Sequence, residues 1–105
     1  MKKYQIRWSP EAKDELKEIY NYLKKKSLQG STNVKNAIID TVESLEEPLL
    51  NYPYDPYLGE PYRYVVVKNY KHFKIIHIKT ANIIDILSIF NTWQDTTKLT
   101  SIKNR

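Results

Sequence analysis

The chain has 105 residues, of which 41% are hydrophobic, and a formal net charge of +5, so it fits one compact domain spanning residues 1–105. It contains no cysteine, which excludes disulfides, thiolate metal sites and a cysteine nucleophile. No apolar run approaches the roughly 18 residues that a membrane span needs. We therefore expect a soluble, cytoplasmic protein without membrane contact.

The positive charge is concentrated in the second part of the chain. Residues 1–60 carry nine Lys/Arg and ten Asp/Glu, whereas residues 61–105 carry eight Lys/Arg and two Asp/Glu. A surplus of this kind indicates a polyanionic partner, either nucleic acid or an acidic protein. The alternative interpretation is that the extra lysines only keep the protein soluble.

The N-terminal region predicts a short strand followed by a helix. Residues 4–8 alternate, with Tyr4, Ile6 and Trp8 on one side. A helix start follows, in which Ser9 caps the free backbone N–H groups and Pro10 suits the first helical position. Apolar residues at steps of three and four then form one helical stripe: Ala12, Leu16, Ile19, Tyr20 and Leu23.

A second amphipathic helix is predicted directly after the first. We expect Gly30 to end the first helix and one of the three residues 31–33 to cap the second. Its apolar stripe reads Val34, Ala37, Ile38, Thr41, Val42 and Leu45, and Pro48 is expected to end it. The two helices would form a hairpin.

Residues 46–61 hold four of the five prolines, a density that neither a helix nor a central strand tolerates. We expect an ordered loop whose tyrosines pack against the body of the domain. Three strands are predicted next, at residues 62–67, 73–79 and 83–90, joined by connections short enough for hairpins. The tail, residues 96–103, is expected to form a short helix or to lie loose.

The predicted fold class is α+β. An N-terminal strand and a two-helix hairpin precede a three-stranded antiparallel sheet, with both helices on one face. The opposite face would then be uncovered, and it would belong largely to the basic part of the chain.

The candidate chemistry lies in the last three strands. Arg63 sits within a strand-like run, where an arginine is costly unless it meets an anion or a carboxylate. A salt bridge to Glu60 or Asp85, or simple exposure on an edge, is the structural alternative. Lysines and aromatic residues, which together suit a phosphate backbone with stacked bases, cluster around one hairpin: Lys68, Tyr70, Lys71, His72 and Lys74. Solubility of a hairpin tip explains those lysines equally well.

Other site types find little support in the sequence. The two histidines, His72 and His77, would not share a strand face, and no third ligand stands at metal spacing, so we expect no metal and no cofactor. His72 is a candidate for proton transfer near neutral pH. Asn91 and Trp93 close the last strand, where Trp93 either caps the core, stacks on a base or anchors a partner.

Taken in order, these segments resemble the RelE/ParE superfamily of toxins from type II toxin–antitoxin systems. The resemblance covers residues 4–99. It rests on the opening strand with Ser9-Pro10-Glu11-Ala12, the first helix, Pro61-Tyr62-Arg63, the run from Tyr70 through Phe73–Ile78, and the segment 83–95.

The resemblance implies a toxin that is neutralised by an antitoxin encoded beside it, through an acidic or amphipathic segment. It leaves open whether the chain acts as a homodimer or in a hetero-oligomer with that antitoxin. RelE-like members cut messenger RNA on the ribosome without a metal, using Arg, Lys, His or Tyr side chains. ParE-like members bind DNA gyrase and do not cut RNA.

The chain departs from the nuclease pattern at its last strand. Many relatives carry a histidine followed closely by an arginine there, whereas this chain has Asn91 and Trp93 near those places. A neutral amide cannot transfer a proton as histidine does, and tryptophan cannot offset phosphate charge. Arg63, the one family position carried over, and His72 remain the candidates for catalysis. The loss favours ParE-like inhibition of gyrase or replication. A RelE-like endoribonuclease and a non-enzymatic module that binds an antitoxin or nucleic acid are the alternatives.

Overall fold

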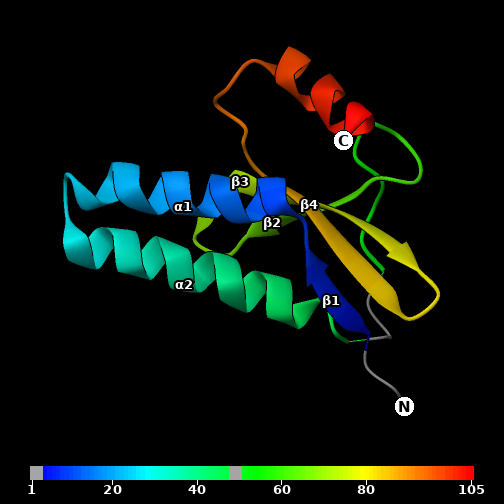
Figure 1. The fold of residues 1–105 in the computed structure, drawn as a ribbon, viewed down its shortest axis with the longest axis horizontal. Coiled ribbons are helices and arrows are strands. Elements are labelled where there is room, and N and C mark those ends of the chain that lie inside the picture. The colour runs from blue at the N-terminus through cyan, green and yellow to red at the C-terminus, as the bar shows by residue number, and fades with distance from the viewer. Residues whose placement is uncertain (1–3, 48–50) are drawn as a thin grey trace.

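The computed structural model describes residues 4–47 and 51–105. A strand, β1 (Gln5–Trp8), leads into two helices, α1 (Pro10–Lys24) and α2 (Leu28–Ser44). Three strands follow, β2 (Arg63–Val67), β3 (Tyr70–Thr80) and β4 (Ile83–Asn91), and a 3-10 helix, η1 (Thr96–Asn104), ends the chain. Figure 1 shows α1 and α2 as an antiparallel pair beside the sheet, with η1 on the other side of α1. No helix of the described residues is long and apolar enough to cross a membrane.

The four strands form one sheet in the order β1-β4-β3-β2. The last three strands pair antiparallel as predicted, and β1 adds a parallel fourth strand that aligns Gln5 with Ile83. The sheet therefore has one strand more than predicted. The amphipathic alternation at Tyr4, Ile6 and Trp8 is confirmed, since all three pack against the core beneath the helices.

Ser9 fixes the start of α1 as the sequence predicts. Its hydroxyl accepts a hydrogen bond from the Ala12 N–H at 3.0 Å and donates to the Leu87 carbonyl at 3.2 Å, which ties α1 to β4. The expected role of Gly30 as the end of this helix is wrong. Ser27 caps α2 by accepting from the Gly30 N–H at 3.0 Å, so Gly30 lies in the first turn of α2. The expected stop at Pro48 lies outside the described residues.

The main core fills the space between the helical hairpin and one face of the sheet. Helix residues such as Ala12, Ile38 and Val42 meet strand residues such as Ile75 and Ile86, and all five are at most 1% exposed. These residues come from both predicted helical stripes and from alternate strand positions. The hydrophobic effect therefore determines which sheet face the helices cover.

The opposite face of the sheet is covered, which corrects the expectation of a bare cationic surface. A second, smaller core joins Leu58 of the proline-rich loop and two residues of η1, Leu99 and Ile102, to Ile76 and Phe90 of the sheet. The loop reaches this face around the edge strand β2. Two backbone hydrogen bonds attach the loop at this edge. The Tyr64 N–H of β2 donates to the Pro53 carbonyl, and the Asp55 N–H donates to the carbonyl of Tyr62, just before β2.

Candidate functional site

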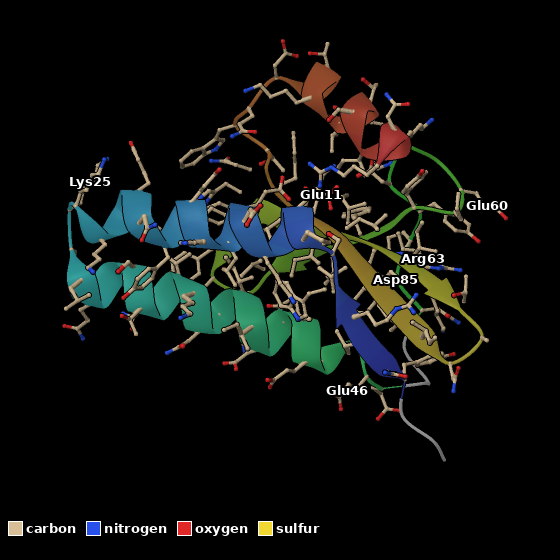
Figure 2. The ribbon with its side chains drawn as sticks, in the orientation of Figure 1. Glu11, Lys25, Glu46, Glu60, Arg63 and Asp85 are labelled. Atoms are coloured by element: carbon tan, nitrogen blue, oxygen red, sulfur yellow. The ribbon has the colours of Figure 1, made fainter. Side chains whose placement is uncertain are left out.

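Arg63 lies on the edge strand β2, on the side of the molecule away from the helical-hairpin tip marked by Lys25 (Figure 2). Its guanidinium donates to the Tyr52 carbonyl at 2.5 Å and to the Tyr54 hydroxyl at 3.2 Å, and it stands 4.3 Å from the Tyr54 ring centroid. Of the structural alternatives, the salt bridge to Glu60 or Asp85 is wrong, whereas the position on an edge strand is as expected, with the side chain half-buried. Asp85 pairs with Arg7 at 2.8 Å instead.

Lys79, on β3, adds a second cation near His77 beside that of Arg63. Its ammonium donates to the Asn51 side chain at 3.0 Å and stands 4.7 Å from the ring centroid of Tyr4. We call the group formed by Arg63, Lys79, Tyr4, Tyr52 and Tyr54 the Arg63 surface. Cations seated over aromatic rings keep their charge available while their position is fixed.

His77 lies beneath the Arg63 surface and is 2% exposed. It stands opposite Arg63 in the β2–β3 pairing, and its ring meets the Tyr52 ring edge-on, with 5.9 Å between the centroids. The pKa of His77 is lowered to about 4, chiefly by burial. A hydrogen bond to the Ile75 carbonyl opposes this shift, and the charges of Arg63 and Lys79 contribute to it. His77 is therefore neutral at physiological pH.

Lys74 does not belong to an exposed cationic patch, contrary to the prediction. It is 6% exposed and forms an ion pair with Asp55, with 2.5 Å between the ammonium and the carboxylate. The Asp55 carboxylate also accepts the backbone N–H groups of Tyr57 and Leu58. Lys74 therefore fastens the proline-rich loop to the far face of the sheet.

The remaining residues of the predicted hairpin cluster separate in space. Lys68 and Lys71 are exposed next to the β2–β3 turn, whereas Tyr70 is half-buried against the core beneath the helices. His72 turns toward the end of β4, where its ring stacks on Trp93 at a centroid distance of 4.2 Å and an angle of 10°. The cluster therefore does not form one surface.

Trp93 is 79% exposed, so it does not cap the core. The turn that carries it is nevertheless fixed by hydrogen bonds. The Asn91 side chain accepts from the Trp93 N–H at 2.9 Å, and the His72 carbonyl accepts from both the N–H and the hydroxyl of Thr92. Asp95 then caps η1 by accepting from the Thr97 N–H, and this bond lowers the pKa of Asp95. An exposed indole thus projects from a rigid turn.

A groove with a volume of about 590 Å³ separates this turn from α1. One wall is a face of α1 made of residues at helical spacing, Glu15, Glu18, Ile19, Tyr22 and Leu23, and it is continued by Lys26 in the turn after the helix. The other wall comes from the facing ends of β3 and β4 and from the turn: His72, Phe73, Ile89, Asn91, Trp93 and Gln94. We call this the α1 groove. The segment that leaves β4 runs beside the middle of α1 (Figure 1).

Sequence reasoning missed the α1 side of the groove and the partners of Arg63. Glu18, Tyr22 and Lys26 lie outside the apolar stripe predicted for the first helix. The available signal is Tyr22, an aromatic residue outside that stripe, which is 58% exposed. Tyr54 and Lys79 could not be placed, since only the folded loop brings residues 51–54 beside β2 and β3. Among the described residues, no three His, Asp or Glu side chains gather as a metal site would require.

Comparison with known proteins gives two results that agree. The profile of the family described as "ParE toxin of type II toxin-antitoxin system, parDE" matches residues 6–96. A solved structure described as "Chromosomal ParDE TA system from P. aeruginosa" contains a chain with a similar fold, at a TM-score of 0.71 and 18% sequence identity. The similarity covers 84% of this chain and 95% of that one. A search of curated proteins finds no significant match. The chain belongs to the ParE toxin family of type II toxin–antitoxin systems, and its partner is an antitoxin.

Proposed function

We propose that this toxin stops growth by binding and inhibiting DNA gyrase, and that it does not cut messenger RNA. The observation that carries the proposal is the separation of the two residues that a nuclease would use, Arg63 and His72. Arg63 stands opposite His77 on β3, and His72 lies five residues before His77 on that strand. At about 3.3 Å per residue, five residues span roughly 16 Å.

Metal-independent RNA cleavage needs its proton-transfer and charge-stabilising groups around one phosphate, each within about 3 Å of the reacting atoms. The predicted site residues Lys74 and Asn91 do not fill the gap between His72 and Arg63. Lys74 is neutralised by Asp55 on the other sheet face, and one face of the His72 ring stacks on Trp93. Asn91, at the end of β4, offers an amide that already accepts from the Trp93 backbone.

The Arg63 surface suits recognition of a protein better than catalysis. Arginine and tyrosine are enriched where proteins bind one another, especially at positions that contribute most to affinity. The Arg63 guanidinium has five N–H groups and uses two of its nitrogens for Tyr52 and Tyr54, so donors remain for an acidic partner. We therefore assign the gyrase contact to this surface.

A supercoiling assay with purified toxin and purified gyrase tests the proposal. We expect wild-type toxin to inhibit supercoiling and Arg63→Ala to need at least about tenfold more protein for the same inhibition, because an anchoring cation is lost. Arg63→Lys is the matched variant that keeps the charge but loses the fork of donors. Melting temperatures would establish that both variants are folded. Unaffected gyrase, together with cleavage of a message on translating ribosomes, would contradict the proposal.

A further inference from the structure

The helical hairpin carries a row of lysines along one side of α1. Lys13, Lys17, Tyr20 and Lys24 follow one another at helical spacing, so they share a side of that helix. Lys35 of α2 joins them, because its ammonium stands 5.1 Å from the centroid of the Tyr20 ring, and the Lys24 ammonium stands 6.0 Å from the same point. We call these five residues the lysine face.

The charge of the lysine face is not neutralised within the described part of the chain. Its four lysines are exposed, and none of them has an ion pair or a hydrogen bond with a described residue. From residue 19 to residue 39 the sequence has four lysines and no Asp or Glu. Asp14 precedes Lys17 by about one turn but forms no ion pair with it, and Glu15 and Glu18 line the α1 groove on another side of the helix. The face therefore presents a field of one sign.

Tyr20 lies where this charge is most concentrated. Its half-buried ring is approached by two ammoniums, those of Lys24 and Lys35, which repel each other. A bound anion would relieve that repulsion. The Tyr20 hydroxyl has no hydrogen bond with a described residue, so it is free to donate one to the same anion. Two lysines and a phenol around one ring are the kinds of donor that phosphate oxygens accept from proteins.

The composition of the lysine face favours nucleic acid over an acidic protein or a membrane. Lysine is depleted in interfaces between proteins, whose centres hold apolar or aromatic anchors, and the exposed large hydrophobic residues of this chain lie outside the face. A helix that lies on a membrane inserts its apolar side into the lipid. The apolar stripe of α1 is instead packed on the core, through Leu16, Ile19 and Leu23.

The geometry of the face favours a duplex over a single strand. Proteins that hold single strands stack bases on open aromatic rings, whereas the Tyr20 ring is occupied by its two lysines. Lys13 and Lys24 are eleven positions apart on one helix, about 16 Å, which lets them reach phosphates on both sides of a major groove about 12 Å wide. We propose that the lysine face binds the phosphate backbone of duplex DNA, with the Tyr20 hydroxyl on one phosphate and without reading the sequence. This inference does not rest on the identity of the toxin's target.

The first test measures fluorescence anisotropy of a labelled duplex of about 20 base pairs, titrated with purified toxin over a series of NaCl concentrations. Wild-type toxin should bind with a slope of log affinity against log salt of about −3 to −4, because each neutralised phosphate contributes about −0.9. Changing the four lysines of the face to Gln, which is also a good helix former, should weaken binding at least about 30-fold at about 50 mM salt. The slope should fall below about 1 in magnitude. Binding and slope equal to those of wild type would overturn the proposal.

A matched variant separates the face from the charge of the whole chain. Four exposed lysines elsewhere are changed to Gln, which gives the same net charge: Lys68, Lys71, Lys98 and Lys103. This variant should keep the wild-type slope to within about 1 and lose less than about threefold in affinity. Melting temperatures should be close to that of wild type for both variants, since all the changed lysines are exposed. Equal losses of affinity would overturn the proposal, because net charge alone would then attract DNA.

Tyr20→Phe distinguishes a positioned contact from diffuse attraction. The change keeps the ring between its two lysines and removes only the hydroxyl, so the salt slope should stay as in wild type while affinity falls about fivefold. An affinity equal to that of wild type would contradict the contact between Tyr20 and a phosphate.

Competition with other polyanions tests the class of partner. An unlabelled single strand of the same length, of DNA or RNA, should need at least about fivefold more material than unlabelled duplex DNA to displace the labelled duplex. Poly-glutamate and vesicles containing phosphatidylglycerol, at equal anionic charge, should compete still less. A competitor that matches duplex DNA would overturn the proposal in favour of its own class. None of these measurements involves gyrase, so failure of this inference is distinguishable from failure of the proposed function.

Discussion

The Arg63 surface and the α1 groove lie on different parts of the same small sheet and differ in chemistry. The first combines two cations with tyrosines, on the edge strand and the proline-rich loop. The second combines exposed aromatic residues with carboxylates, on α1 and the turn after β4. The net charge of a chain therefore does not describe each of its surfaces.

The largest effect on stability is expected at Lys74, which belongs to neither surface. Lys74→Met keeps the length of the side chain but leaves the buried Asp55 carboxylate without its cation. We expect a loss of about 3 kcal/mol in the free energy of unfolding, measured by urea denaturation. Lys71→Met, at an exposed position, should change it by less than about 0.5 kcal/mol. A stable Lys74→Met variant that has lost toxicity would instead assign Lys74 to target binding.

The second expected effect is a pH dependence of stability, which tests the burial of neutral His77 beneath the Arg63 surface. His77 has a folded-state pKa of about 4, below its ordinary value of 6.5. The unfolded chain therefore binds the proton first, so stability is lost as pH falls from about 6.5 toward 4 and the loss levels off below that. Between pH 7 and pH 4.5 we expect this group to account for about 2 kcal/mol. His77→Asn, which keeps a donor for the Ile75 carbonyl, should lose correspondingly less stability over that interval. Equal pH profiles would show that His77 is not buried in its neutral form.

A smaller effect is expected at Ser9, which positions the α1 wall of the groove. Ser9→Ala removes the cap of α1 and the bond to the Leu87 carbonyl. The unfolding free energy should fall by about 1 kcal/mol, with no change in the denaturant slope. Ser27→Ala, at the cap of α2, is the matched control, because it removes a cap but no bond to the sheet. Its stability loss should be no larger than that of Ser9→Ala, and a larger loss would contradict the role of Ser9 in tying α1 to β4.

The smallest stability effect is expected at Trp93. Because Trp93 is 79% exposed, Trp93→Ala should leave the unfolding free energy within about 0.5 kcal/mol of wild type, by urea denaturation. A loss of more than about 2 kcal/mol would show that Trp93 supports the fold.

Regular elements were predictable because their patterns are local. The alternation at residues 4–8, the stripe beginning at Ala12 and the cap at Ser9 each depend on neighbours in sequence, and each is present in the structure. The boundary between the helices was mistaken because Ser27 and Gly30 both carry helix-end signals. Ser27 is the residue that caps α2, since its hydroxyl accepts a hydrogen bond from the Gly30 N–H.

The candidate site was less predictable because it depends on contacts between distant segments. Lys74 and Asp55 are 19 positions apart, and nothing in either local sequence indicates that they meet. The cationic face was inferred from strand order alone, without the loop and η1 that cover it. The stacking of His72 on Trp93 likewise requires the register of β3 on β4, which brings Phe73 opposite Asn91.

Sequencing of RNA 5′ ends after toxin induction, in cells lacking the antitoxin, distinguishes inhibition of gyrase from cleavage of messenger RNA. We expect growth arrest with a DNA-damage response and without new ends inside translated codons, for wild-type toxin and for Trp93→Ala alike. New ends clustered within codons, present with wild-type toxin and absent with Arg63→Ala, would contradict it. They would show that the separated groups of this sheet assemble on the ribosome into a nuclease.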